Sequence, residues 1–312
     1  MVEIKEYFEA LNSLEAIDCA CLYYKGTTCC LFKNDHNKMH NIRSLSKLVV
    51  SLCVGILLDK QKEFNVELTL DTRIWPFIKK YANTDIRQSW LLGKVKIIDL
   101  LNQTTGFSDE TLMFRSTIDL KKADMFMNYV MNSPINYMPG EQFVYSNASA
   151  YILSCFVQEI TGYRLDEFAK RYLFEPLGIK EIEWDIYGKI CAGASGLKIS
   201  FNSFRRLIEL IRDNYVFRAS KIVSYTYIKQ LVEQQKKIKG TKCLTTPMEP
   251  MAYGLFVYKS KANFIYITGA GGQLFVYDPD EDIMILVFSH MQHSIELATI
   301  TYDFIKKFKR NN

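Results

Sequence analysis

The sequence predicts an α+β fold in which a central antiparallel sheet, built from both ends of the chain, is flanked by helices. Two β-prone segments lie near the start of the chain, and a group of β-rich segments at short spacing lies near its end. Helical patterns interrupted by Gly and Pro fill the middle. Because strands from the two ends join most simply in one sheet, we expect the middle to form a helical insertion.

The composition is typical of a folded globular protein and excludes disordered and fibrous classes. The 312 residues are 48% hydrophobic and 23% charged, which suits one large domain or two of ordinary size. The net charge of +5 is spread along the chain and is not gathered in a basic arm. We therefore do not expect a nucleic-acid partner.

The first 60 residues are predicted to form a helix, a hairpin and a second helix. Residues 2–14 carry apolar side chains at helical spacing, as in an amphipathic helix that covers a core. The β-prone runs 16–24 and 27–32 are separated by Lys25-Gly26, which indicates a hairpin. Residues 45–59 are apolar on nearly every side of a helix, so we expect this helix to be buried.

The rest of the chain divides into a helical middle and a β-rich end. Helices are predicted at residues 96–103, 119–132, 147–161, 165–174, 203–212 and 225–236. An antiparallel meander is predicted from the runs 252–258, 263–268, 273–277 and 283–288. A final amphipathic helix is expected over 294–309, with a Lys-rich outer side that complements the helix dipole.

Neither export nor metal binding is indicated. The N-terminus is acidic and lacks the apolar stretch of a secretory signal, and the apolar run 48–58 is too short to cross a bilayer. Eight cysteines without an export signal indicate reduced thiols, so we expect a cytoplasmic protein without a membrane partner. The pairs His36 with His40 and His290 with His293 fit no metal template, and we expect no metal or other cofactor.

The first candidate for chemistry is Ser44-Leu45-Ser46-Lys47, at the start of the predicted buried helix. Side chains three residues apart share a helical face, so the Lys47 amine and the Ser44 hydroxyl can hydrogen-bond. Unpaired N–H groups and the positive end of the dipole at a helix start favour charge on an attacked carbonyl oxygen. The second copy of the motif, Ser195-Gly196-Leu197-Lys198, has no apolar helix behind it, so context selects Ser44.

Two further motifs lie later in the chain. Tyr145-Ser146-Asn147 follows a Pro-Gly turn and opens a helical pattern, whereas the similar Tyr81-Ala82-Asn83 lacks both features. Taken alone, Tyr145 is better explained as a packed core tyrosine. The small residues of 268–273 (Thr-Gly-Ala-Gly-Gly-Gln) lie between predicted strands and indicate a close approach to the backbone. A phosphate-binding loop is the alternative, but it requires a helix to follow, and here a strand follows.

In order and surroundings, the three motifs resemble those of the serine β-lactamase and penicillin-binding-protein superfamily. The Tyr-x-Asn form is similar to the class C β-lactamase branch, with its related esterases and 6-aminohexanoate-dimer hydrolases. Residues 97–106 resemble the signature T-I-x-x-L-L-x-x-T-S-G, and the likeness extends over residues 40–290. It implies a β-lactamase/transpeptidase-like fold, with a sheet domain of 1–61 and 190–312, a mainly helical subdomain of 62–189, and an active site in the cleft between them.

The resemblance also implies a role for each motif. Ser44 would be the nucleophile and Lys47 its proton acceptor, and Tyr145 would serve the leaving group as a second acid/base. Asn147 would hydrogen-bond Lys47 or a substrate amide. Substrate and oxyanion contacts would come from the backbone N–H groups of Ser44 and Ala270 and from the neighbouring Thr268 and Gly269.

The proton chemistry of Lys47 depends on its surroundings. An ordinary lysine amine is almost wholly protonated at pH 7, so Lys47 needs burial, or Tyr145 as a proton partner, to act as a base. The neighbouring apolar residues Leu48, Val49 and Leu52 supply a desolvating environment.

One position departs from the family pattern. Ile267 stands where antibiotic-hydrolysing and peptidase members carry Lys or His, a cation that commonly engages a substrate carboxylate. We therefore expect a serine hydrolase that forms an acyl-enzyme on Ser44 and acts on small-molecule esters or linear amides. A true β-lactamase or D-Ala-D-Ala carboxypeptidase is the alternative within the family. Outside enzymes, a ligand-binding or sensor module without turnover and a purely structural protein remain alternatives.

Overall fold

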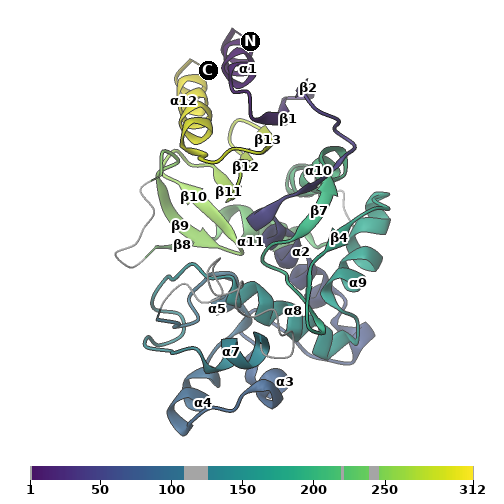
Figure 1. The fold of residues 1–312 in the computed structure, drawn as a ribbon, viewed down its shortest axis with the longest axis vertical. Helices are drawn as coiled ribbons and strands as arrows, with labels where there is room; N and C mark the ends of the chain where they lie inside the picture. The colour runs from purple at the N-terminus through teal and green to yellow at the C-terminus, as the bar shows by residue number, and fades with distance from the viewer. Residues whose placement is uncertain (1, 109–125, 219–220, 239–245, 312) are drawn as a thin grey trace.

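The computed structural model describes residues 2–108, 126–218, 221–238 and 246–311. Its centre is an eight-stranded sheet whose strands lie in the order β2-β1-β13-β12-β11-β10-β9-β8 (Figure 1). Each neighbouring pair is antiparallel, and β1, near the start of the chain, pairs with β13, the last strand. The predicted α+β fold, with one sheet built from both ends of the chain, is therefore confirmed.

The strands of this sheet are β1 (Ile17–Tyr24), β2 (Thr27–Phe32), β8 (Lys236–Lys237), β9 (Pro250–Gly254), β10 (Val257–Ser260), β11 (Ile265–Gly269), β12 (Gln273–Asp278) and β13 (Ile283–Ser289). Smaller sheets are formed by β3 (Met39–Asn41), β7 (Leu197–Ser200) and β4 (Glu183–Trp184), and by β5 (Ile186–Tyr187) and β6 (Ile190–Cys191).

The described helices are α1 (Val2–Ser13), α2 (Ser46–Asp59), α3 (Trp75–Ile78), α4 (Ile86–Leu92), α5 (Ile97–Leu101), α7 (Phe126–Asn132), α8 (Ala148–Thr161), α9 (Leu165–Ala169), α10 (Phe201–Phe217), α11 (Tyr225–Glu233) and α12 (Ile295–Asn311). The first part of the helix predicted at 119–132 lies outside the described residues, and α7 is its described part. Within the described ranges, no helix is long and apolar enough to cross a bilayer.

The two terminal helices pack together beside the sheet (Figure 1). Tyr7 of α1 stacks on Phe304 of α12, with ring centroids 4.5 Å apart, and its hydroxyl lies 3.0 Å from Thr301 Oγ1. Both helices turn apolar residues inward, as their helical periodicity predicts. The seven cysteines within the described residues are free thiols, whereas Cys243 lies outside them.

The helix α2 is the buried helix that its sequence predicts. Every residue from Ser46 to Leu57 is buried, and α2 contacts both α8 and α9. Figure 1 shows α3, α4, α5, α7 and α8 on the side of the molecule opposite the two termini. The turn Arg43–Leu45 before α2 contacts β11 and β12 of the sheet, and α2 contacts α8, so the start of α2 lies between the sheet and this helix.

The single strand predicted over 252–258 is wrong, because the chain turns back within it. The strands β9 and β10 form a hairpin, and the turn residues Leu255 and Phe256 have φ angles of 48° and 65°. The Leu255 N–H donates to Asn102 Oδ1 (3.2 Å), and the Phe256 N–H donates to the Leu101 carbonyl (2.9 Å). A distant segment therefore stabilises a turn whose two central residues, Leu255 and Phe256, are not Gly, Pro, Asn or Asp.

Other boundaries differ in smaller ways. The helix predicted over 165–174 ends at Ala169 and continues as a π-helical turn over Lys170–Phe174. The helix predicted at 203–212 is longer, from Phe201 to Phe217. His40, for which the sequence predicted no strand, is in the short strand β3.

Candidate active site

Ser44 lies in a single 3-10 turn, Arg43–Leu45, directly before α2. Arg43 has a φ of 53°, in the left-handed region that is uncommon for residues other than glycine. Its N–H donates to Asn41 Oδ1 (3.0 Å), and its carbonyl accepts a hydrogen bond from Ser46 Oγ (2.5 Å). Side chains on both sides thus hold the sharp turn that presents Ser44 at the start of the buried helix.

The Lys47 amine is the centre of the site's hydrogen bonds. Its side chain is fully buried, and Lys47 is the second residue of α2. Its Nζ lies 3.3 Å from Ser44 Oγ, 2.7 Å from Asn147 Oδ1 and 3.2 Å from the Ala194 carbonyl oxygen. These three groups come from distant parts of the chain, so the fold brings the Ser-x-x-Lys and Tyr-x-Asn motifs into direct contact.

Tyr145 lies beside this amine, and its half-buried ring is 4.8 Å from Lys47 Nζ. The ring stacks on Tyr258 (6.4 Å, 14°) and meets the edge of Tyr253 (6.4 Å, 84°). Burial, followed by the neighbouring Tyr145, raises the pKa of the Tyr253 hydroxyl. Tyr253 therefore stays neutral at neutral pH and forms an uncharged wall behind Tyr145.

Gln103 holds the Tyr145 segment in place, and the sequence did not single it out. Its side chain is fully buried; Nε2 donates to the Ser146 carbonyl (2.9 Å) and Oε1 accepts from the Ser146 N–H (3.0 Å). Its own carbonyl accepts from the Val144 N–H (2.9 Å). The only available signal was its place in the 97–106 signature, which indicated the fold and not this contact.

The third motif forms the end of β11, which contacts the turn that carries Ser44. A Cβ atom at Gly269 would lie 2.8 Å from the Ile42 carbonyl oxygen, so only glycine allows this approach. Among the described residues, β10 pairs with β11 only at Ile265 and Tyr266. The backbone of 267–269 thus extends past β10, next to the turn that carries Ser44.

The side chains of this strand end differ in exposure. Thr268 is half-buried and Ala270 is exposed, whereas Ile267 is buried and pairs with Phe275 on β12. The turn that follows is fixed by Ser289, whose Oγ donates to the Gly271 carbonyl (2.6 Å). Thr268, Gly269 and Ala270 therefore lie on a braced strand end beside Ser44.

The two similar motifs elsewhere in the chain have structural partners of their own. Lys198 of the second Ser-x-x-Lys pairs with Glu183 (2.8 Å), and the Tyr81 hydroxyl donates to Glu159 (2.6 Å). The Gly-rich stretch around the second Ser-x-x-Lys nevertheless contributes to the site, because it supplies the Ala194 carbonyl to Lys47. Within the described ranges, no cluster of His, Cys, Asp or Glu suits a metal ion.

Several solved structures have low sequence identity to this chain and matching folds. A Bacillus anthracis protein provisionally assigned as a 6-aminohexanoate-dimer hydrolase has a TM-score of 0.77 at 17% identity, covering 97% of this chain and 81% of that one. A penicillin-binding protein from Bacillus halodurans has a TM-score of 0.70 at 14% identity, and the match covers 98% of this chain and 99% of that one. EstCE1, a hydrolase with promiscuous acyltransferase activity, has a TM-score of 0.73 at 13% identity, and the match covers 97% of this chain and 98% of that one.

Curated relatives match a shorter region. The N-acetylmuramyl-L-alanine amidase of Bacillus subtilis is 28% identical over 91 residues, which is 28% of this chain and 21% of that protein. The chain thus matches about a fifth of the length of these relatives. The β-lactamase family profile, by contrast, matches residues 30–308. With the β-lactamase/transpeptidase-like fold around Ser44 and Lys47, this match over most of the sequence shows that the chain belongs to the β-lactamase family.

Proposed function

We propose that this protein is a serine hydrolase that forms an acyl-enzyme on Ser44 and acts on esters or linear amides. The observation that carries the proposal is the buried Lys47 amine, in hydrogen-bonding contact with Ser44 Oγ and Asn147 Oδ1. A hydroxyl becomes an effective nucleophile when an adjacent group takes its proton, and the 3.3 Å contact between Ser44 and Lys47 suits that transfer.

The hydrogen bonds of Lys47 suit a change of protonation state. A protonated amine has three N–H groups for Ser44, Asn147 and Ala194. A neutral amine keeps two N–H groups for Asn147 and Ala194 and turns its lone pair to the Ser44 hydroxyl. Lys47 can therefore accept the Ser44 proton without losing its other two partners.

In the proposed first step, Ser44 Oγ attacks the substrate carbonyl and its proton passes to Lys47. The tetrahedral oxyanion lies at the start of α2, where the backbone N–H groups of Ser44 and Ala270 are the proposed donors. The bond to the leaving group then breaks, and the leaving group takes a proton from Tyr145, which Lys47 reprotonates. Acyl transfer to Ser44 and departure of the neutral alcohol or amine complete this step.

In the second step, water releases the acyl group. Tyr145 and Lys47 take a proton from the attacking water, and Ser44 regains one as the ester bond breaks. The products are a carboxylic acid and the free enzyme. The same two groups thus act as acid in one step and as base in the other.

Esters and linear amides are favoured over β-lactams and peptides with a free carboxylate because of Ile267. Where antibiotic-hydrolysing members carry a cation, this buried side chain offers only apolar surface. A substrate carboxylate would lose its water there without gaining an ionic partner, which is costly.

A substrate panel tests this proposal. It comprises 4-nitrophenyl acetate, a linear anilide, nitrocefin and a D-alanyl-D-alanine peptide, each with wild type, Ser44→Ala and Ser195→Ala. We expect sustained ester turnover that Ser44→Ala lowers at least about 10³-fold, because the nucleophile is lost. Ser195→Ala, in the second Ser-x-x-Lys motif, is the matched control and should stay within about threefold of wild type.

Other outcomes would contradict the proposal in different ways. Equal ester turnover by wild type and Ser44→Ala would refute the nucleophile. A stoichiometric mass gain on Ser44 without product release, measured by intact-mass spectrometry, would indicate a sensor and not an enzyme. Preferred turnover of nitrocefin or the peptide would replace the proposed substrate class by one of the alternatives within the family.

A further inference from the structure

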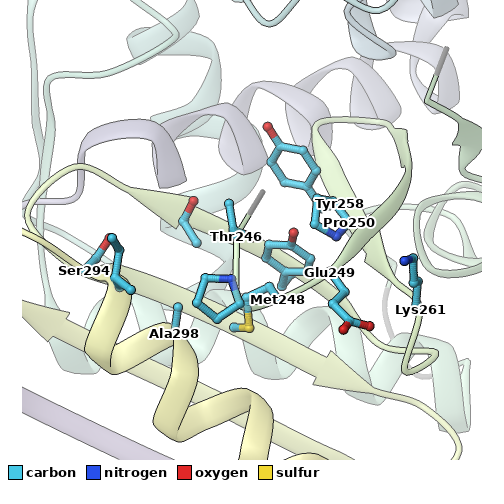
Figure 2. Close-up of a pocket in the computed structure, with 12 residues that line it drawn as sticks. Thr246, Met248, Glu249, Pro250, Tyr258, Lys261, Ser294 and Ala298 are labelled. Atoms are coloured by element: carbon cyan, nitrogen blue, oxygen red, sulfur yellow. The ribbon is translucent and has the colours of Figure 1, made fainter. Parts of the chain in front are cut away.

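A cavity of about 620 Å³ lies between the end of β11 and the start of α12 (Figure 2). This volume is within the range of pockets that bind small organic molecules. Its walls include the rings of Tyr258 and Tyr266 and the side chains of Met248, Pro250 and Ala298, with Thr268 at one edge. The cavity lies outside the hydrogen-bonded group of Ser44, Lys47 and Asn147, so the chemistry described above does not account for it.

The interior of the cavity is mostly apolar, and its charged groups lie at one end. Figure 2 shows Glu249 and Lys261 on the side away from Ser294. The Glu249 carboxylate already accepts a hydrogen bond from the Tyr302 hydroxyl (2.6 Å). Rings, a thioether and a methyl group form much of the remaining wall. An uncharged apolar group therefore fits the cavity better than a charged one.

The cavity is connected to the candidate active site at two points. Thr268 lines it and directly precedes Gly269, whose backbone lies against the turn that carries Ser44. Tyr258 also lines it, and its ring stacks on Tyr145 on one side (6.4 Å, 14°) and on Tyr266 on the other (5.2 Å, 19°). A series of nearly parallel rings thus leads from the proposed acid/base group into the cavity.

We propose that this cavity binds the apolar alcohol portion of an ester substrate, such as an aryl group. The inference rests on the proposed function, in which Tyr145 protonates the leaving group. Tyr258 lines the cavity and stacks on Tyr145, so the cavity lies next to the group that would protonate the departing alcohol.

The proposal separates the two steps of the reaction. Two esters with the same acyl group and different alcohols give the same acyl-enzyme. Changes in the cavity should therefore alter acylation by the ester with the large alcohol. They should leave the release of the acyl group unchanged, because the alcohol has already departed.

The test compares 2-naphthyl acetate with methyl acetate in variants of α12. Ala298→Phe fills the cavity, and we expect it to lower kcat/KM for 2-naphthyl acetate at least tenfold while methyl acetate stays within twofold. The matched control is Thr299→Phe at an exposed position of the same helical turn, expected to stay within twofold for both esters. Should Ala298→Phe disturb folding, Ile295→Glu places a charge at the exposed rim (67% exposed) and should disfavour the naphthyl ester in the same direction.

A binding measurement keeps this inference separate from the proposed function. We expect 2-naphthol to bind the Ser44→Ala variant in a fluorescence titration, and binding to weaken at least tenfold when Ala298→Phe is added. This measurement needs no turnover. If the protein had no esterase activity, the proposed function would be refuted, and 2-naphthol binding would still test which ligand the cavity takes. Unchanged 2-naphthol binding, or equal losses for both esters, would overturn the inference. So would a shift in preference between acetyl and octanoyl esters of one alcohol, because the cavity would then bind the acyl group.

Discussion

Gln103 acts on the candidate active site at the scale of a single residue, through two hydrogen bonds to the Ser146 backbone. Ser146 lies between Tyr145 and Asn147, so this one amide fixes the backbone of both. Its local sequence places it near the end of a helix, but the identity of its partner depends on tertiary packing. The Ser44 and Lys47 contact was predictable because the two residues lie three apart across the start of a helix, whereas the contacts of Gln103 and Ala194 join distant segments.

Replacing Gln103 with Met should separate positioning from chemistry. The change keeps the approximate size but removes both hydrogen bonds between the Gln103 amide and the buried Ser146 backbone, at a cost of about 1–3 kcal/mol in stability. Displacement of Tyr145 and Asn147 should lower kcat/KM for 4-nitrophenyl acetate about 10- to 100-fold. Urea unfolding and steady-state kinetics measure the two effects. Gln88→Met, which removes a comparable clamp on the Ser133 carbonyl, should cost stability without this loss of activity.

At the scale of elements, the site depends on the close approach of β11 to the Arg43–Leu45 turn. The small residues of 268–273 predicted such an approach, although the sequence could not say which element approaches. The turn between β9 and β10 was not predictable, because its left-handed residues Leu255 and Phe256 depend on hydrogen bonds that their N–H groups donate to the Asn102 side chain and the Leu101 carbonyl. Local patterns thus predicted most strands and missed the turn that tertiary contacts impose.

Gly269→Ala tests the approach of β11 to the nucleophile turn. The added methyl group would lie 2.8 Å from the Ile42 carbonyl oxygen, and neither backbone can give way without moving the other. We expect a loss of about 1–3 kcal/mol in the free energy of unfolding, together with a fall in ester turnover of about tenfold or more. Gly93→Ala, at the end of α4, is the control: its added Cβ also meets a tight contact, 3.2 Å from the Ser89 carbonyl oxygen, so it should cost stability without lowering ester turnover. Wild-type turnover by Gly269→Ala would show that the approach is not needed.

At the scale of the whole molecule, a group of polar residues joins the two ends of the chain. The buried Asp18 on β1 contacts His290, which follows β13, with Nδ1 to oxygen distances of 3.1 and 3.2 Å. His40 on β3 lies 3.9 Å from the same carboxylate. The union of both chain ends in one sheet was predictable from the positions of the β-prone segments. The contacts of Asp18 with His290 and His40 were not predictable, because they depend on the register of the strands.

His40 makes the stability of the molecule depend on pH. Burial lowers the pKa of its imidazole below the usual value of 6.5, and the nearby Asp18 only partly opposes this. The unfolded chain therefore binds a proton here more readily than the folded chain. The stability contributed by neutral His40 is fully present above the unfolded-state pKa of about 6.5 and is lost as the pH falls from there through the lower pKa of the folded state. The difference in free energy of unfolding between wild type and His40→Gln should shrink between pH 8 and 5, and parallel profiles would contradict this assignment.

The pairing of β1 with β13 also affects how the chain acquires its fold. The hairpin of β1 and β2 is made early during synthesis, yet its neighbour in the sheet, Ile283–Ser289, leaves the ribosome only after most of the chain. Isolated hairpins are marginally stable in water, and pairings between distant segments form slowly. The nascent protein must therefore keep an open, apolar strand edge from aggregating until the final strand arrives to cover it.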